Sequence, residues 1–146
     1  MATKLATRGA QYALTAEFTF DVANDTMVNA AGAADNFATV ASHVFDAIKL
    51  PTNATVVGGE VVTETAVSGA TAYNVSVGDS VTADRYLGAT NRVTAGRTPL
   101  VLTGFVGNGE DIRVTVAPTV AAATAGKVTV RVQYVIRNRM QETQTH

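Results

Sequence analysis

The chain has 146 residues, no cysteine and a formal net charge of −1. This length suits one domain with a real hydrophobic core, and the missing cysteines exclude disulfide frameworks, Cys-based zinc sites and thiol catalysis. The near-neutral charge gives no bulk attraction to nucleic acid or to an anionic membrane. Only 16% of the residues are charged, against a typical ~25%, so we expect a surface rich in apolar and small side chains, which often rests against another molecule.

The N-terminal segment predicts an arm followed by a strand. Residues 1–12 are polar and small, without the apolar core of a secretory signal, and predict either an arm that orders on contact or a frayed end. Residues 14–21 alternate between apolar and polar side chains, which is the period of a half-buried strand. The side chains expected to point inward are Leu14, Ala16, Phe18 and Phe20.

Residues 22–50 allow two interpretations. Residues 29–36 are rich in Ala, Asn and Asp and indicate a loop. Apolar residues from Phe37 to Ile48 are spaced for one face of a helix that Asp35 would cap. However, residues 43–50 also suit a strand with a bulge near Asp46. We favour the strand, because β-branched and aromatic residues dominate elsewhere in the chain.

Residues 50–87 predict two further strands and a turn. Pro51 ends any preceding helix, and Gly58-Gly59 inside an apolar run indicates a bulge or a close backbone approach. Ser68-Gly69 is a turn signal between the strands at 56–67 and 73–77. Ser80 is expected to cap a short helical turn that ends near Leu87.

The remaining residues predict a loop at 88–96, short strands at 100–106 and 112–116 joined by a hairpin at Gly107-Asn108-Gly109, and an end at Pro118. An alanine-rich connection at 119–126 then leads to the clearest strand, at 128–136. The sequence thus predicts an all-β fold, an antiparallel β-sandwich that is jelly-roll-like, with about eight strands and little helix. We expect an N-terminal arm (1–12), one sandwich domain (13–137) and a C-terminal tail (138–146).

The search for catalytic and metal-binding motifs favours no site. There are two histidines, and His43 is interpreted as a loop or strand-edge residue, not a ligand. Calcium at Asp79 and Asp84 is weighed against Asp79 as a turn residue and Asp84 paired with Arg85 or a cap, which we favour. Glu60 and Glu64 would lie ~13 Å apart on one strand, too far for a glycosidase pair. We therefore expect no enzyme, no cofactor, no metal and no small-molecule substrate.

Basic side chains line the outward face of the last strand: Lys127, Arg131, Arg137 and, just beyond, Arg139. They suit either docking on an acidic neighbour or an ordinary solubilising face, and the second interpretation is slightly favoured. Nucleic-acid binding is disfavoured, because this face lacks interleaved aromatic residues.

Four segments, taken in order, resemble one family. They are KLPTNATVVGG at 49–59, NVSVGDS at 74–80, DRYL at 84–87 and GKVTV at 126–130, followed by Tyr134. Together they look like the small head proteins of tailed bacteriophages, over roughly residues 43 to 137. The resemblance implies a jelly-roll cement or decoration protein, made in the cytoplasm of a bacterial host. It would sit on the outside of an icosahedral capsid and tie together major capsid subunits of the HK97-like fold.

The same resemblance implies a homodimer or homotrimer, because cement proteins of this kind bridge symmetry axes. We expect the arm, the tail and the last strand to contact the capsid or a second copy, through Lys4, Arg8, Tyr12, Arg131, Arg137 and Arg139.

The alternative from another class is a carbohydrate-binding or adhesin-like module of a phage particle. It would need exposed aromatic side chains, and the plausible ones are Tyr12, Tyr86 and Phe105.

Overall fold

The computed structural model describes residues 12–137, which contain strands and no helix. The strands follow the chain in the order β1 (Leu14–Asp21), β2 (Thr26–Val28), β3 (Ala34–Asn36), β4 (His43–Ile48), β5 (Thr52–Ser68), β6 (Ala72–Gly78), β7 (Leu87–Asn91), β8 (Gly96–Pro99), β9 (Val106–Asn108), β10 (Ile112–Thr119) and β11 (Ala125–Ile136). The predicted all-β class is confirmed. No helix long enough to cross a membrane was found in the described part of the chain.

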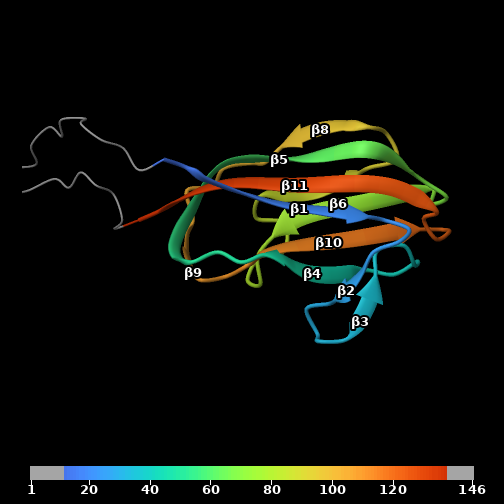
Figure 1. Ribbon diagram of the computed structural model, residues 1–146, viewed down its shortest axis with the longest axis horizontal. Coiled ribbons are helices and arrows are strands. Elements are labelled where there is room, and N and C mark those ends of the chain that lie inside the picture. The colour runs from blue at the N-terminus through green and yellow to red at the C-terminus, as the bar shows by residue number, and fades with distance from the viewer. Residues whose placement is uncertain (1–11, 138–146) are drawn as a thin grey trace, which may run out of the picture.

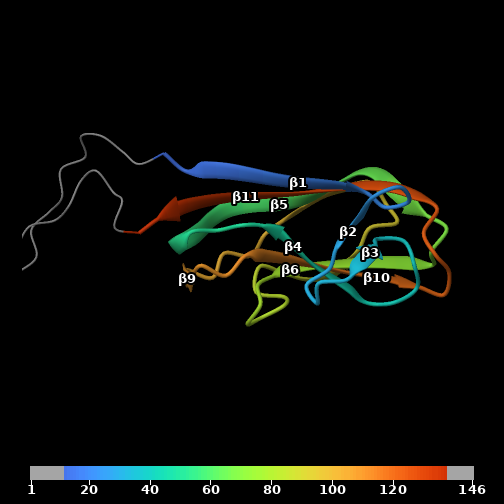
Figure 2. The same cartoon turned by 60° about the horizontal axis from the view of Figure 1, so that its bottom comes forward.

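Two antiparallel sheets form the two layers of the molecule (Figures 1 and 2). The first has the order β1-β11-β5-β8, with β9 also paired to β5, and the second has the order β4-β10-β6-β7. The hairpin β2–β3 forms a separate two-stranded sheet beside β4. Both ends of the described chain leave from the same end of the sandwich, where β9 also lies (Figure 1).

The core lies between the two sheets and is filled by the inward residues that the alternation predicted. Val128, Val130 and Val132 on β11 are fully buried, as are Val114 and Val116 on β10. On β1 burial increases along the strand, from Leu14, which is 45% exposed, to Phe20, which is 1% exposed.

An aromatic stack closes the side of the sandwich next to the β2–β3 hairpin. The ring centroid of Phe37 lies 4.4 Å from that of Phe20 on β1 and 4.1 Å from that of Phe45 on β4. The Tyr73 hydroxyl donates a hydrogen bond of 2.7 Å to the carbonyl of Phe37, and burial raises the pKa of Tyr73. Phe37 therefore joins the edges of both sheets.

The structure decides between the two interpretations of residues 37–50. Residues 43–48 form strand β4, so the helix alternative is wrong. The predicted bulge near Asp46 is present, because Arg113 pairs with Asp46 while the adjacent Ile112 pairs with Ile48, and Ala47 has no partner residue on β10. The predicted loop at 29–36 is only partly correct, since residues 34–36 form β3.

Three predictions between residues 88 and 109 are wrong. The expected loop at 88–96 contains most of β7 and the start of β8. The expected strand at 100–106 is irregular up to Phe105, because the N–H of Leu100 bonds to Gly59 on β5, whereas that of Val101 bonds to Tyr86, in the loop just before β7. The Asn108 turn makes no hairpin with β10, since β9 pairs with β5.

Pro118 does not end its strand as predicted. β10 continues to Thr119, and Pro118 lies opposite Tyr73 on β6. On its other side β10 is paired with β4 only as far as Val116, opposite His43. Beyond Val116, no described strand pairs with β10 on the β4 side. Pro118 can therefore lack an N–H without breaking a hydrogen bond to β4.

Candidate functional site

The outer face of the first sheet carries a row of alternating charges. Arg131 on β11 donates to Glu17 on β1 at 2.7 Å and to Glu60 on β5 at 2.6 Å. Glu60 also accepts a hydrogen bond from Arg97 on β8. The hydrogen bond from Arg97 holds the pKa of Glu60 below its usual range, and Glu17 likewise raises the pKa of Arg131. The row therefore crosses four strands.

A second, shorter group of charges lies further along the same face. Thr129 donates to Glu64 at 2.7 Å, and Lys127 lies 3.3 Å from the same carboxylate. The hydrogen bond from Thr129, followed by that from Lys127, holds the pKa of Glu64 below its usual value. Glu60 and Glu64 thus each have a basic partner, which suits a solvated face and not a catalytic carboxylate pair.

The structure places three of the six predicted interface residues. Tyr12 is 85% exposed at the start of the described chain, and Arg137 is exposed at its other end. Arg131 lies between two carboxylates of its own chain, so it is poorly placed to meet an acidic neighbour. Lys4, Arg8 and Arg139 lie outside the described residues.

Exposed apolar side chains gather in loops at the end of the sandwich where the chain ends leave. In the β8–β9 loop Val101 is 63% exposed and Leu102 is 52% exposed, and Val81, in the β6–β7 loop, is 71% exposed. β6 and β8 both end on this side of the molecule (Figure 1). Sequence reasoning missed this feature because it assigned residues 100–106 to a short apolar strand.

The loop that follows β6 is built around Asp79, which is 3% exposed. Its carboxylate accepts hydrogen bonds from the backbone N–H groups of Val81 and Thr82 and from the guanidinium of Arg85. Burial raises the pKa of Asp79, but the hydrogen bonds from Arg85 and the loop backbone outweigh it, so the net shift is downward. Asp79 is therefore a turn residue, as favoured over a calcium ligand, and it takes the capping role that we had predicted for Ser80.

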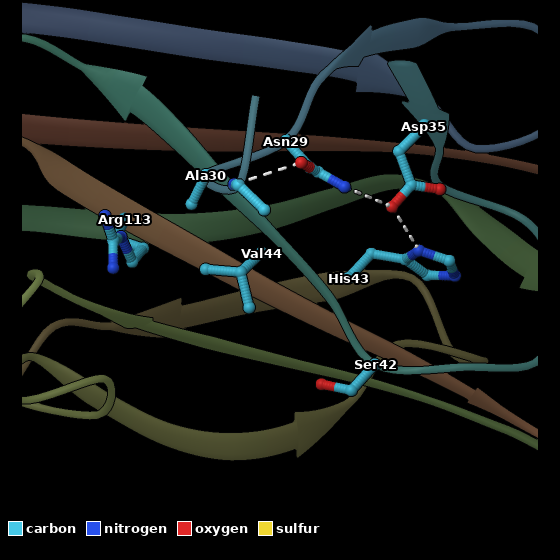
Figure 3. Close-up of a pocket in the computed structure, with 8 residues that line it drawn as sticks. Asn29, Ala30, Asp35, Ser42, His43, Val44 and Arg113 are labelled. Atoms are coloured by element: carbon cyan, nitrogen blue, oxygen red, sulfur yellow. Dashed lines mark hydrogen bonds and ion pairs between the residues drawn. The ribbon is translucent and has the colours of Figure 1, made fainter. Parts of the chain in front are cut away.

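The β2–β3 hairpin and β4 line an open pocket of about 410 Å³, to which β10 contributes Arg113 (Figure 3). Asp35 on β3 points toward His43 at the start of β4, with 2.7 Å between the carboxylate and Nδ1. Asn29 donates to the same oxygen at 3.2 Å. His43 is only 6% exposed, so it is a buried strand-edge residue. Sequence reasoning did not predict that Asp35 would pair with His43, because the spacing of residues 35 and 43 matches no known motif.

The pocket does not provide the usual parts of a hydrolytic site. Nε2 of His43 lies 2.9 Å from the carbonyl oxygen of Thr39, and Nδ1 faces the carboxylate of Asp35. Nε2 also lies 3.1 Å from the Thr39 hydroxyl, so both ring nitrogens of His43 already have hydrogen-bond partners within the chain. Within residues 12–137, no group of three His, Cys, Asp or Glu side chains is arranged to hold a metal ion.

Comparison with known proteins gives a likeness of fold. No family model and no curated protein matches the chain. Three solved structures contain chains that match. The capsid asymmetric unit of cyanophage Pam1 matches at 23% identity and a TM-score of 0.59, over 92% of this chain and 94% of that one.

The other two matching structures are also of phage capsids. The acidic stable capsid of Helicobacter pylori bacteriophage KHP30 matches at 15% identity and a TM-score of 0.61, over 94% of this chain and 96% of that one. The capsid of Ralstonia phage GP4 matches at 16% identity and a TM-score of 0.59, over 92% and 90%. The chain therefore shares its fold, over nearly its whole length, with chains of three phage capsids.

Proposed function

We propose that this chain is a structural protein of a phage virion, which binds the outer surface of an icosahedral capsid and cements or stabilises the major capsid subunits. The observation that carries the proposal is the shared fold with chains of three phage capsids, over at least 92% of this chain. The four sequence segments that resemble phage head proteins support it independently.

The strand connections support a jelly roll, a fold that viral capsid proteins use repeatedly. Apart from the β2–β3 hairpin, the orders β1-β11-β5-β8 and β4-β10-β6-β7 place successive strands of the chain in alternate sheets, except where β6 passes to β7 and β8 passes to β9. In this proposal residues 13–137 form the body, and residues 1–12 and 138–146 form the arm and the tail.

The surface proposed to meet the capsid is the end of the sandwich that carries Tyr12, Arg137, Val101 and Leu102. It combines exposed apolar loops with both points from which the rest of the chain continues. The proposed partners are a major capsid protein of the HK97-like fold and further copies of this chain as a dimer or trimer. A stable contact buries ~1,200–2,000 Å², and many copies on a symmetric shell would add avidity to weak contacts.

The carbohydrate-binding alternative loses two of its three aromatic residues. Tyr86 is only 4% exposed. Phe105 is covered by the guanidinium of Arg85, which lies 3.6 Å above the ring centroid. A sugar-binding platform needs exposed aromatic faces, so Tyr12 alone does not favour this function. An enzymatic role is likewise not proposed, because the His43 ring is occupied on both sides.

The proposal is tested by mixing the purified chain with shells of its major capsid protein and measuring occupancy after sedimentation. We expect saturable binding, reduced at least about tenfold in a Val101→Ser, Leu102→Ser variant. The control is Val120→Ser, which removes a still more exposed apolar side chain (81%) from the β10–β11 connection. If the wild-type chain remains in the supernatant at every concentration, the proposed function is wrong.

A further inference from the structure

Of the five edge strands in the two main sheets, β1 differs from the others. β8 has four residues and ends in Pro99, β9 has three residues, β7 has a register shift, and β4 carries the bulge at Ala47 and bonds to the β2–β3 hairpin. These are the usual means by which proteins prevent further strands from adding to an edge. β1 has eight residues in unbroken register with β11, and it contains no Pro, Lys or bulge. It is therefore a straight edge that is open to another strand.

The backbone groups on the outer edge of β1 can be assigned. The N–H of Val22 bonds across to Gly126, so residues an even number of positions away, such as Phe20 and Phe18, also face β11. Asp21 faces the other way, because both its N–H and its carbonyl bond to Asp25. The N–H and carbonyl groups of Thr15, Glu17 and Thr19 consequently point outward, and no hydrogen bond to them is found among the described residues.

Charge gives this edge a preferred partner. The row on the outer face runs Glu17, Arg131, Glu60, Arg97, from negative on β1 to positive on β8. Asp21 lies opposite Lys127 in the register of β1 and β11, and its carboxylate accepts hydrogen bonds from Ala23 and Asn24. Each row thus ends on β1 with a carboxylate, so a strand added here should carry two basic residues, four positions apart, on its outer face.

The eleven residues before Tyr12 have this pattern. Lys4 and Arg8 are four positions apart and share one face of an extended chain with Ala6, while the uncharged residues Leu5, Thr7 and Gly9 share the other. We propose that residues 5–11 of a second copy of this chain add to β1 as an antiparallel strand, whose backbone hydrogen bonds end at Thr19 because Asp25 occupies the N–H and carbonyl of Asp21. Arg8 of that copy lies opposite Glu17, and its Lys4 lies opposite Asp21.

This register suits both faces of the sheet at once. On the outer face the small side chain of Ala6 lies opposite Thr19, between the two charge pairs. On the inner face Leu5 lies opposite Phe20 and Thr7 lies opposite Phe18, so no charge is brought against the apolar side of β1. Moving the strand by two positions in either direction separates at least one basic residue from its carboxylate.

A second copy suits the site better than the chain's own arm. In the same register, an arm folding back on its own β1 would need a two-residue turn at Tyr12-Ala13. Such turns require positive φ and favour Gly, Asn or Asp. Between two copies the arrangement is reciprocal, since each arm adds to the other copy's β1 about a two-fold axis near Tyr12. Direct pairing of two β1 edges is disfavoured, because β1 carries carboxylates and no base.

Cysteine cross-linking tests the register, because the wild-type chain has no cysteine. The proposal places Gln11 of one copy opposite Leu14 of the other, in a pair whose Cα atoms approach to ~4.5 Å. Leu14 is 45% exposed, so replacing it should not disturb folding. We expect Gln11→Cys and Leu14→Cys variants, mixed in equal amounts and oxidised, to give a covalent dimer.

The matched control mixes Gln11→Cys with Thr15→Cys, whose side chain points to the opposite face of the strand. The proposal requires at least about tenfold more cross-linked dimer in the first mixture than in this control. Equal yields in the two mixtures, or no dimer in either, would overturn it. The measurement uses purified protein without any capsid, so its failure is separate from a failure of the proposed function.

A full-length Lys4→Glu, Arg8→Glu variant tests the charge pairing without new cysteines. Its expected behaviour in sedimentation equilibrium is dissociation to a monomer at concentrations where the wild-type chain is a dimer. Lys49→Glu, a reversal at an exposed residue away from β1, should leave the dimer intact. A wild-type chain that is monomeric throughout, or a charge-reversed variant that dimerises equally well, would contradict the proposal.

Discussion

Nδ1 of His43 lies 2.7 Å from Oδ2 of Asp35 and thereby ties strand β4 to the β2–β3 hairpin. The His43 side chain is 7% exposed and that of Asp35 is 20% exposed, so the pair is partly shielded from water. The hydrogen bond from His43 lowers the pKa of Asp35 by more than burial raises it. The contact therefore stabilises the folded protein only while Asp35 is ionised.

The first prediction concerns the pH dependence of this contact. Since the pKa of Asp35 in the folded protein is below the ordinary value of about 3.9, its contribution is complete above that pH and is lost as the pH falls through the folded-state pKa. We expect Asp35→Asn to cost about 1 kcal/mol at neutral pH, because a charged hydrogen bond becomes a neutral one. Thermal unfolding at several pH values should show the difference disappearing in acid, and a difference that is constant with pH would contradict the prediction.

The second prediction concerns Phe37, whose ring lies between those of Phe20 and Phe45. Phe37→Ala should destabilise the protein by about 3–5 kcal/mol, because it leaves a cavity between the edges of the two sheets. Urea denaturation measures the loss. Val40→Ala, at a site that is 52% exposed nearby in the chain, should change stability by less than about 0.5 kcal/mol.

The local alternation of the sequence was enough to predict β1 and β11 and the all-β class, because burial on one face of a strand imposes a period of two. The strand with a bulge near Asp46 was also favoured over a helix, because β-branched and aromatic residues dominate elsewhere in the chain. Contacts between segments that lie far apart in the sequence could not be predicted. Glu17 and Arg131 are 114 positions apart and meet only because β1 lies beside β11, a strand order that no local pattern contains.

The wrong predictions between residues 88 and 109 have a related cause. Gly and Asn suggested loops and a local hairpin, but β7, β8 and β9 are short strands held by longer neighbours, β6 and β5. Their pairing partners, and not their own propensities, make them strands. The Asp35–His43 pocket was missed for the same reason, since the β2–β3 hairpin that presents Asp35 was interpreted as a loop.

The third prediction concerns Gly59, one of two glycines that indicated either a bulge or a close backbone approach. Its φ is +139°, and an added Cβ would overlap the carbonyl oxygen of Arg131. Gly59→Ala should therefore separate β5 from β11 and cost at least about 1–3 kcal/mol. Gly88→Ala is the matched control, because an added Cβ there meets nothing within 4 Å. Equal denaturation midpoints for the two variants would contradict this account of β5.

The fourth prediction concerns Arg92, a buried cation between β7 and β8. The residue is 3% exposed, and Nη1 donates to Thr98 at 3.0 Å. Nε and Nη2 have no hydrogen-bond partner among the described residues, and burial lowers the pKa of the guanidinium. Burying a charge without a carboxylate partner costs free energy of folding, so we expect Arg92 to destabilise the fold where β7 leads to β8.

We expect Arg92→Met, which keeps the length of the side chain and removes the charge, to leave stability unchanged or to raise it by about 1–4 kcal/mol. Arg92→Ala should be less stable than Arg92→Met, because it also removes the packed methylene groups. Thermal unfolding of both variants makes the comparison. A loss of more than about 2 kcal/mol in Arg92→Met would show that the guanidinium has partners that stabilise it, and the account of a destabilising charge would then be wrong.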